Sequence, residues 1–343
     1  MPRLAIIGLG LIGGSVGLAL KRGRLEGLEI VGHDAEWGVN GRARKLGAID
    51  REARHSAEAA EGAAVVVIAT PILQVKQVLE QIAPVLGEGA VVTDTASTKR
   101  DVVRWANELL PEGVHFVGGH PIAGKEQSGV EAADAALFEG RPWAITPSIH
   151  AAEEAIKTVE NLVALVGATP VLIDAEEHDS YMAAVSHLPL LVSTALFSLV
   201  SQSRAWPELA AIAGPGFRDT TRLASSSPDL SHDICLTNQE NLLHWLDRFA
   251  EELGRLRGLI EESGAQEGLV KAFATAQADR DAFLLSPPPK PEPERPADLL
   301  SAGERMMSFM VGEYVVRRTK EVEGLMRERE QGKGGTGRTS KGR

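Results

Sequence analysis

Two histidines lie in sequence contexts that suit acid–base chemistry. His120 follows Gly118 and Gly119 at the end of an apolar stretch, and Gly124 comes four residues later. An imidazole titrates at about pH 6.5, so a histidine in a glycine-rich loop at a strand end is a candidate general base. His187 lies in Ser-His-Leu-Pro within a long helical pattern, where a core histidine with satisfied hydrogen bonds is the commoner interpretation.

Two arginines are spaced for binding carboxylates. Arg218 and Arg222 are four residues apart in Phe-Arg-Asp-Thr-Thr-Arg, which predicts that they share one face of a helix. A guanidinium can bind a carboxylate through two parallel hydrogen bonds, so the pair suits a dicarboxylate. Considered alone, such a pair is more often engaged in surface ion pairs.

A glycine-rich stretch near the N-terminus has the pattern of a dinucleotide site. Gly8, Gly10 and Gly13 form G-x-G-x-x-G between an apolar run and a helical pattern. The three glycines permit a tight turn, close approach of a pyrophosphate, and packing of the helix on the strand, respectively. Asp34 follows the next strand, where a carboxylate accepts hydrogen bonds from the ribose of NAD and repels the 2′-phosphate of NADP. The expected cofactor is NAD, and the candidate binding residues are Gly8, Gly10, Leu11, Ile12, Gly13 and Asp34.

Two later strands also end in residues that can reach a ligand. Thr70 and Pro71 close one apolar run, and a hydroxyl-rich turn that contains Ser97 closes the next. Parallel strands bring their carboxyl ends to one edge of a sheet, so we expect Thr70 and Pro71 beside the cofactor and Ser97 near a ligand. Thr98 and Asp101 also fit a capping box, which would give this turn a purely structural role.

The elements that must position these residues fall into two groups. Apolar strand patterns alternate with helices and predict a doubly wound α/β sheet of the Rossmann type. Long helical patterns follow, interrupted by Gly-Pro-Gly and Ser-Ser-Ser-Pro turns. The predicted strands are 4–7, 29–33, 64–69, 90–94, 115–119, 142–147 and 168–173, and the predicted helices after them are 177–200, 207–213, 234–259 and 268–284.

These patterns divide the chain into three segments. We predict a dinucleotide-binding domain over residues 1–173 and an all-helical substrate and dimerisation domain over 174–286. The helices of the second domain are rich in alanine and leucine, so we expect them to pack against a second copy in a homodimer. Residues 287–343 are predicted to be a proline-rich linker, a segment that can form a helix, and a disordered basic tail.

Composition and charge restrict the class of protein. The 343 residues carry a formal net charge of −11, which argues against a nucleic-acid partner and means that an anionic substrate needs local basic groups. Cys235 is the only cysteine, so we expect neither an intramolecular disulfide nor a cysteine-based metal site. We find no apolar run of membrane-spanning length and no convincing signal-peptide cleavage site. The expectation is a cytoplasmic protein with no membrane association and no metal.

Four motifs together resemble those of the prephenate/arogenate dehydrogenase family of tyrosine biosynthesis. They are the glycine motif at 8–15, His-Pro-Ile-Ala-Gly at 120–124, Ser-His-Leu-Pro at 186–189 and Phe-Arg-Asp-Thr-Thr-Arg at 217–222. They occur in the same order as in the family, and the resemblance covers residues 4–286. No single motif is specific, but their ordered combination is. The family fold, a Rossmann-type domain followed by a helical dimerisation domain, agrees with the element patterns.

The resemblance implies oxidative decarboxylation of prephenate to 4-hydroxyphenylpyruvate, with transfer of a hydride from C4 of the ring to NAD. By similarity, His120 accepts the proton of the 4-hydroxyl group and Ser97 hydrogen-bonds the same region. Arg222 binds a substrate carboxylate, and His187 contacts the side-chain end. Matching positions with supporting roles are Glu126 and Arg218.

One departure from the family and three alternatives remain open. Family members often carry a tryptophan before an Asp-Ile pair, whereas residues 228–234 read Pro-Asp-Leu-Ser-His-Asp-Ile. This puts in doubt how the cleft closes and which side chain the substrate bears, so arogenate dehydrogenase is the nearest alternative. A β-hydroxyacid dehydrogenase would need a catalytic lysine signature near His187, and none is present. A non-catalytic NAD-sensing protein would have no use for the combination of His120, Ser97, His187 and Arg222.

Overall fold

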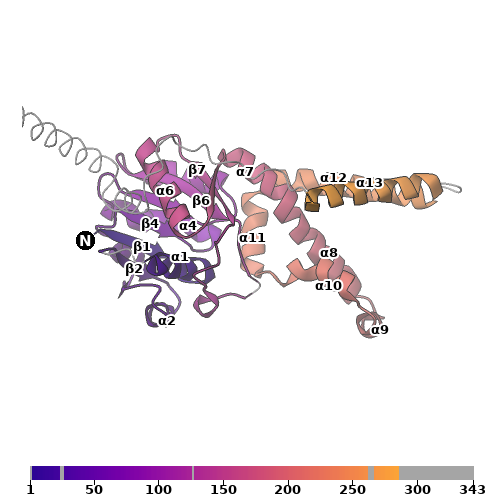
Figure 1. Cartoon of the computed structure of the whole chain (residues 1–343), viewed down its shortest axis with the longest axis horizontal. Coiled ribbons are helices and arrows are strands. Elements are labelled where there is room, and N and C mark those ends of the chain that lie inside the picture. Colours follow the sequence, from indigo (N-terminus) through magenta and orange to yellow (C-terminus); the bar gives the residue numbers. More distant parts are fainter. Residues whose placement is uncertain (1, 24–26, 126, 262–265, 286–343) are drawn as a thin grey trace, which may run out of the picture.

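A computed structural model describes residues 2–23, 27–125, 127–261 and 266–285. The chain forms a sheet domain followed by a set of helices that extends away from one edge of the sheet (Figure 1). The predicted supporting residue Glu126 and the predicted linker and tail, 287–343, lie outside the described residues.

The sheet domain has the strand order of a Rossmann fold with two strands added at one edge. Within the described residues the order is β3-β2-β1-β4-β5-β6-β7-β8, and all neighbouring pairs are parallel except β6 with β7. The order reverses between β1 and β4, and ligands of such sheets bind at the carboxyl ends beside this point. The doubly wound sheet is therefore confirmed. The strands are β1 (Arg3–Ile7), β2 (Glu29–His33), β3 (Arg51–Glu52), β4 (Val65–Ile68), β5 (Val91–Asp94), β6 (His115–Pro121), β7 (Pro142–Pro147) and β8 (Thr169–Leu172).

Helices cover both faces of the sheet, which explains why its strands are nearly continuous apolar runs. Side chains alternate along β1, so Leu4 and Ile6 join the apolar core on one face while Ala5 and Ile7 join the core on the other. The first core is closed by α1 (Leu11–Arg22), α2 (Val39–Lys45) and α6 (Glu153–Leu165). The second core is closed by α3 (Ser56–Ala60), α4 (Ile72–Ile82) and α5 (Arg100–Leu109).

Three local differences separate this domain from the expectation. The two-residue strand β3 was not predicted, because two residues are too short for a periodic pattern. The antiparallel pairing of β7 with β6 was also not anticipated. The pattern of residues 73–86 predicts one amphipathic helix. The structure instead has α4 followed by a short 3₁₀ turn over Ala83–Val85, where Pro84 ends the α-helical hydrogen bonding.

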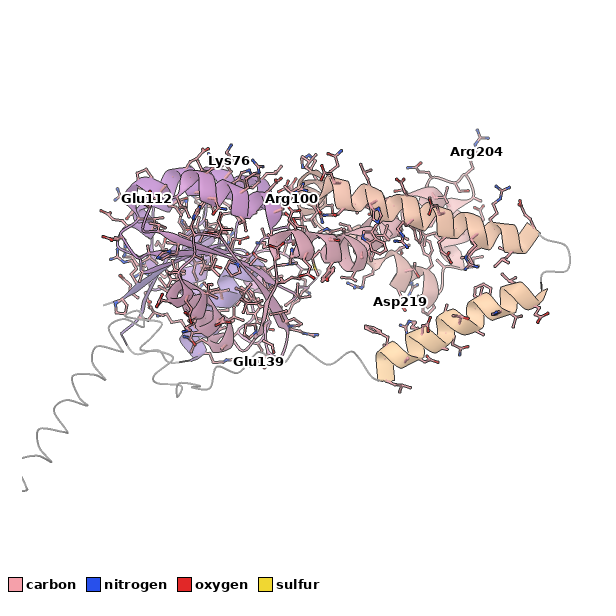
Figure 2. All side chains as sticks on the ribbon, turned by 90° about the horizontal axis from the view of Figure 1, so that it is seen from above. Lys76, Arg100, Glu112, Glu139, Arg204 and Asp219 are labelled. Carbon is pink, nitrogen blue, oxygen red and sulfur yellow. The ribbon has the colours of Figure 1, made fainter. Side chains whose placement is uncertain are left out.

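The second part of the chain consists of helices joined by turns in its described residues. Its elements are α7 (Ala175–Met182), a π-helical turn (Ala183–His187), α8 (Leu188–Ser201), α9 (Trp206–Ala211), α10 (Pro215–Thr221), a 3₁₀ turn (Arg222–Ser225), α11 (Pro228–Thr237), α12 (Gln239–Glu261) and α13 (Gln266–Leu285). The helix predicted over 234–259 is in fact two helices separated at Asn238. Figure 2 shows α12 and α13 extending from the sheet domain, which carries Lys76 and Glu112.

Apolar side chains are poorly covered on several of these helices. Val185 and Leu199 are exposed along the helix that contains α8, and Phe273 and Phe283 are exposed on α13. By length and composition alone, Ala175–Ser201 is a helix apolar enough to cross a membrane, and 22% of its most apolar window is buried. The expectation that nothing in the chain reaches this length is therefore wrong. The expectation failed because serine and threonine residues break up the apolar run in the sequence but add no charge, so the mean hydropathy of the helix stays high.

Candidate active site

The turn between β1 and α1 has the conformation that the glycine motif predicts. Gly8 has a φ of +93°, and a Cβ there would lie 2.5 Å from the carbonyl carbon of Ala69, directly after β4. A Cβ on Gly13 would lie 1.9 Å from the Gly8 oxygen, so glycine alone lets α1 pack against this turn. Around Gly10 a Cβ would meet no atom within 4 Å. Open space therefore lies at the N-terminus of α1, whose first turn has no acidic residue and suits a pyrophosphate.

Asp34 is held beside this turn. One carboxylate oxygen accepts a hydrogen bond from the backbone N–H of Leu9 at 2.7 Å, and the other accepts from the N–H of Glu36 at 2.8 Å. The Asn40 side chain accepts from the Asp34 N–H at 2.7 Å. These contacts fix the carboxylate next to the glycine turn, and each oxygen keeps a further lone pair for a ribose hydroxyl. The residues of this region thus fit an adenine dinucleotide.

The remaining predicted cofactor residues border the same turn. Leu11 and Ile12 are the first residues of α1 and are partly buried. Thr70 and Pro71 connect β4 to α4, and Pro71 immediately precedes the helix. The Thr70 hydroxyl oxygen is buried and has no hydrogen-bond partner among the described residues. A buried, unsatisfied hydroxyl is costly, so its presence at this edge is consistent with a ligand that completes its hydrogen bonding.

The turn after β5 is stabilised differently from the prediction. The Thr98 hydroxyl contacts the Thr237 hydroxyl at 2.8 Å, and the Asp101 carboxylate pairs with Arg104, so these two residues do not form a capping box. Asp179 of α7 caps α5 instead: its two carboxylate oxygens accept from the backbone N–H groups of Lys99 at 2.7 Å and Arg100 at 2.9 Å. The cap therefore comes from the helical part of the chain. Ser97 precedes it in the same turn and is partly buried.

A fully buried ion pair lies beneath this turn. The Lys99 ammonium contacts the Asp94 carboxylate and also donates to the Gly119 carbonyl oxygen at 2.7 Å. Asp94 accepts from the backbone N–H of Gly119 at 3.0 Å, so the pair ties β5 to β6 one residue before His120. Burial lowers the pKa of Lys99, and the neighbouring Asp94 carboxylate opposes that shift. Removing either partner would leave an uncompensated buried charge.

His120 lies within β6, paired in register with Ala144 of β7, so the expectation of a flexible loop is wrong. The two glycines before it have a packing role. A Cβ on Gly118 would lie 2.4 Å from the Thr146 hydroxyl, and one on Gly119 would lie 2.6 Å from the Asp94 carbonyl oxygen. The glycines therefore let β5, β6 and β7 pack closely and hold the imidazole on a rigid strand.

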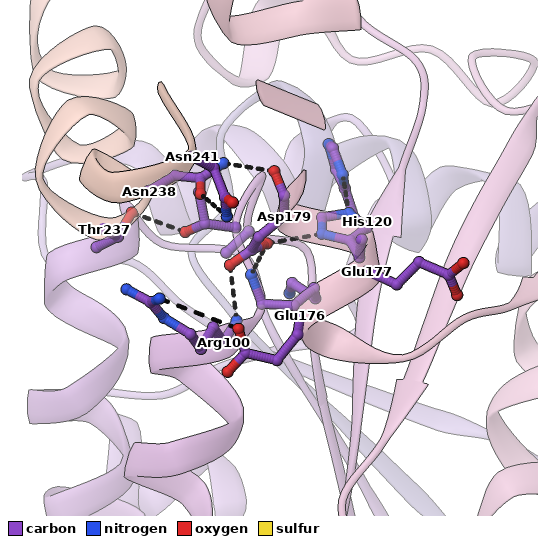
Figure 3. A network of polar contacts seen from close by, with 12 residues as sticks. Arg100, His120, Glu176, Glu177, Asp179, Thr237, Asn238 and Asn241 are labelled. Atoms are coloured by element: carbon purple, nitrogen blue, oxygen red, sulfur yellow. Dashed lines mark hydrogen bonds and ion pairs between the residues drawn. The ribbon is translucent and has the colours of Figure 1, made fainter. Parts of the chain in front are cut away.

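The His120 ring is buried against a second histidine. Its Nδ1 lies 2.9 Å from Nε2 of His178, and Nδ1 of His178 lies 2.8 Å from the Asp179 carboxylate. Figure 3 shows the dashed line of contacts from His120 to Asp179. Burial lowers the pKa of His120 well below 6.5, and His178, Lys99 and His187 lower it further. The imidazole of His120 is therefore neutral at physiological pH.

His187 occupies the last position of the π-helical turn and is buried. The Asn238 amide contacts Nδ1 of His187 at 3.1 Å and donates to the Asp179 carbonyl oxygen at 2.7 Å. Burial lowers the pKa of His187 to about 4, so its ring is neutral. With Nδ1 accepting from Asn238, the proton lies on Nε2, which is buried and has no partner among the described residues. π-helical turns inside α-helices are frequent at functional sites.

The two predicted arginines are not part of this buried cluster. Arg218 is exposed on α10, and Arg222 is exposed at the start of the 3₁₀ turn that follows. Because α10 ends at Thr221, the pair does not share one continuous α-helical face as predicted. Leu223 anchors the turn by packing against the apolar core below the sheet. The structure therefore brings His120 and His187 together and leaves the two arginines exposed.

Four residues of the cluster were missed by sequence reasoning: Lys99, His178, Asp179 and Asn238. Each is buried and polar, which is the property that marks a functional or tightly hydrogen-bonded position. In the sequence, His178 and Asp179 directly follow two exposed glutamates, Glu176 and Glu177. No local sequence feature distinguishes the buried pair from the exposed pair. Burial of one pair follows from the docking of α7 onto α5, which no local pattern encodes.

Comparisons with known proteins agree with this geometry. The family model for the prephenate dehydrogenase nucleotide-binding domain matches residues 16–172, and the model for the prephenate dehydrogenase dimerization domain matches residues 174–275. A prephenate dehydrogenase from Bacillus subtilis is 38% identical over 284 residues, which is 82% of this chain and 76% of the relative.

Solved structures give the same result. A prephenate dehydrogenase from A. aeolicus, crystallised with hydroxyphenyl propionate and NAD+, superposes with a TM-score of 0.77 and 33% identity, covering 82% of this chain and 98% of that one. The arogenate dehydrogenase of Synechocystis superposes with a TM-score of 0.70 and 28% identity over 82% of this chain and 99% of that one. Sequence motifs, strand order and both family models agree, and the chain belongs to the prephenate dehydrogenase family.

Proposed function

We propose that the protein oxidises and decarboxylates prephenate to 4-hydroxyphenylpyruvate with NAD as hydride acceptor. The observation that carries this proposal is a buried, neutral imidazole, His120, on the same sheet edge as a glycine turn shaped for a dinucleotide. The relatives described above are named for prephenate or arogenate oxidation, and one was crystallised with NAD+. Gly8, Gly10, Gly13 and Asp34 are the groups that would hold NAD.

The residues of the chain have to remove one proton and orient the ring. When bound, NAD accepts the hydride from C4 of the ring. His120 takes the proton of the 4-hydroxyl group as that carbon becomes a carbonyl, and Ser97 hydrogen-bonds the same oxygen. The C–C bond to the ring carboxylate then breaks, CO₂ leaves, and its electron pair makes the ring aromatic. The proton on His120 can return to the resulting phenolate oxygen, which balances the reaction.

Two further groups would hold the substrate side chain. The unpaired Nε2–H of His187 can donate to a keto or carboxylate oxygen, and Arg222 can bind a carboxylate through two hydrogen bonds. Glu126 and Arg218 are assigned supporting roles on the basis of the family resemblance. A buried donor at His187 favours the keto group of prephenate over the ammonium group of arogenate, because an ammonium group has only hydrogens to offer.

The experiment is a steady-state assay of the purified full-length protein with prephenate or arogenate and with NAD or NADP. Reduced nicotinamide absorbance and chromatographic detection of 4-hydroxyphenylpyruvate or tyrosine are followed together. We expect the highest kcat/KM with prephenate and NAD, because Asp34 would repel the 2′-phosphate of NADP. Preference for arogenate would reassign the substrate. Binding of NAD without turnover of either compound would favour the NAD-sensing alternative.

The assembly and the location belong to the same proposal. We infer a homodimer formed through the helical part of the chain, whose exposed apolar helices need a cover and whose family model is that of a dimerization domain. A second copy on these helices would also account for the apolar exposure of Ala175–Ser201 without a membrane. Because its proposed substrates are soluble small molecules, such an enzyme would act in the cytoplasm.

A further inference from the structure

The contact between His120 and α7 connects the proposed base to a second His–carboxylate pair. Nδ1 of His120 lies 2.9 Å from Nε2 of His178, and Nδ1 of His178 lies 2.8 Å from Oδ1 of Asp179. His178 and Asp179 are fully buried, and His120 is nearly so. The two imidazole planes cross at 74° with their centroids 5.1 Å apart, and the two nitrogens of the contact face each other. These contacts cross from β6 to α7, that is, between the two domains.

Asp179 determines which atoms donate in the hydrogen bonds from His120 to His178 and from His178 to Asp179. Its carboxylate already faces two N–H donors, the backbone groups of Lys99 at 2.7 Å and Arg100 at 2.9 Å, at the N-terminus of α5. A helix N-terminus favours the charged carboxylate, which can only accept hydrogen bonds. The third contact of Asp179 is with Nδ1 of His178, so this nitrogen must carry the proton.

The same reasoning continues to His120. In the singly protonated form of His178 that carries its proton on Nδ1, Nε2 has a lone pair, which can only accept a hydrogen bond. Nδ1 of His120 must therefore carry a proton and donate it to His178. The lone pair of His120 is left on Nε2, the nitrogen on the other side of the ring. This is the tautomer that a general base needs when its second nitrogen faces the substrate.

We propose that His178 is a positioning residue that, with Asp179, holds His120 in the Nδ1-protonated tautomer and aims its basic Nε2 at the substrate. This inference rests on the proposed function of His120 as base. When His120 accepts the substrate proton, its Nδ1–H remains bonded to His178, and Asp179 stabilises the positive charge through His178. Other charged or titratable groups near His120 are Lys99, whose ammonium pairs with Asp94, and His187, which is neutral.

Two amide substitutions test the two hydrogen bonds of His178 one at a time. In His178→Gln, the terminal amide reaches the former position of Nε2 and can still accept from His120. In His178→Asn, the amide reaches only the former position of Nδ1, so it can contact Asp179 but not His120. Asn and Gln are both polar and similar in size, so we expect the two substitutions to affect folding to a similar extent. NAD binding and thermal unfolding are measured on each to establish that the fold is retained.

We expect His178→Asn to lower kcat by about 10- to 100-fold, a part of the 10²- to 10⁴-fold that a general base supplies, with KM for prephenate and NAD little changed. His178→Gln should retain more of kcat than His178→Asn. Nitrogen-15 NMR of histidine-labelled full-length protein should show Nδ1 of His120 protonated in the wild type and in His178→Gln. In His178→Asn the signal should shift toward a mixture of tautomers. The His120→Asn spectrum assigns the resonances.

The chain offers a matched control in α11. His232 precedes Asp233 just as His178 precedes Asp179, and Nδ1 of His232 lies 3.2 Å from the Asp233 carboxylate. Asp233 also accepts from a backbone N–H at the start of a helix, that of Leu73 in α4. The His232 side chain, however, is 64% exposed and is not in contact with His120. His232→Asn and His232→Gln should therefore leave kcat and the His120 tautomer unchanged.

Equal kcat in His178→Asn and His178→Gln, or an unchanged His120 tautomer in His178→Asn, would overturn the inference. The proposed function fails in a different way. If His120→Asn retains near-normal kcat, His120 is not the base, whereas the tautomer measurement still reports whether His178 orients it. A loss of kcat in the His232 variants equal to that in His178→Asn would also count against a specific role for His178.

Discussion

The neutral imidazole of His120 is the side chain on which the proposed reaction depends most directly. An ordinary histidine, with a pKa of about 6.5, would be partly protonated in slightly acidic solution and unable to accept a proton. Burial on β6 changes this, because a charged ring beside His178 and Lys99 is destabilised and the pKa falls well below 6.5. The titration near pH 6.5 expected from the residue type alone is therefore wrong for the folded protein.

The first prediction concerns the pH dependence of this base. A base whose pKa is lowered stays active to lower pH, so kcat/KM should fall on the acid side only well below pH 6.5, with a limiting slope of one. His120→Asn should reduce kcat by about 10²- to 10⁴-fold while NAD affinity stays close to that of the wild type. Initial rates across pH and NAD titrations measure both. An acid limb centred at pH 6.5 or above would contradict the burial argument.

A second prediction at the same scale concerns Arg222. Replacing Arg222 with alanine should lower kcat/KM for prephenate by roughly 30- to 1,000-fold, equivalent to about 2–4 kcal/mol, because a carboxylate would lose a charge-assisted bidentate partner. Most of the effect should appear in KM. Arg218→Ala, four residues away and also exposed, is the matched comparison and should have a smaller effect. Equal, minor effects in both variants would mean that both arginines are surface ion-pair partners.

Helix ends form much of the junction between the two domains. Asp179 of α7 caps the N-terminus of α5, and Asp233 of α11 accepts from the Leu73 N–H in the first turn of α4. Both capped helices begin at the carboxyl edge of the sheet, where a helix in this fold otherwise presents free N–H groups to a ligand. The caps thus couple the helical domain to the edge that carries His120 and the glycine turn.

The prediction for this junction uses the cap that lies away from the histidines. Asp233→Ala should lower the free energy of unfolding by about 1–2 kcal/mol, the usual cost of losing a helix cap, while kcat changes much less than in His120→Asn. Urea unfolding followed by circular dichroism measures the effect. Asp247→Ala, at an exposed position of α12, is the control and should change the midpoint little. Identical midpoints for the two variants would show that the Asp233 contact contributes nothing to stability.

At the scale of the whole molecule, one group of helices is poorly covered by the other described residues. α12 and α13 extend away from the sheet domain (Figure 1). Together with α8 they expose large apolar side chains such as Leu199, Leu253 and Phe273. Apolar surface on this scale marks an interaction site in a soluble protein. The sheet domain, in contrast, has two closed cores of its own. We therefore expect a second copy to cover the helical domain rather than the sheet domain.

At this level we predict that the segment after α13 is dispensable for assembly and catalysis. Every residue proposed to bind substrate or NAD lies before Pro287, and the helices proposed to form the dimer end at Leu285. Removing residues 287–343 should leave a dimer by light scattering, with kcat and KM close to those of the full chain. A truncated protein that folds but is monomeric or inactive would place the segment in the interface or in the site.

Local patterns were enough for most of the elements and for the conformation of the glycine turn. A positive φ at Gly8 and the close packing at Gly13 follow from the absence of a side chain, which is a property of the residue itself. Apolar β-branched runs predicted strands, and the ordered motifs predicted the family. Asp34 was located by its position directly after the second predicted strand. These inferences succeed because strand and helix periodicity and turn chemistry act over a few neighbouring residues.

Contacts between distant segments could not be read in the same way. His120 and His178 are 58 positions apart and meet because α7 docks on the carboxyl edge of the sheet. That docking buries His178 and Asp179 while Glu176 and Glu177 remain exposed, and it replaces the predicted capping box with a cap from another domain. It also lowers the pKa of His120, because desolvation depends on everything packed around the ring. Residue types and their order thus follow from local chemistry, whereas protonation states and hydrogen-bond partners follow from how the two domains pack.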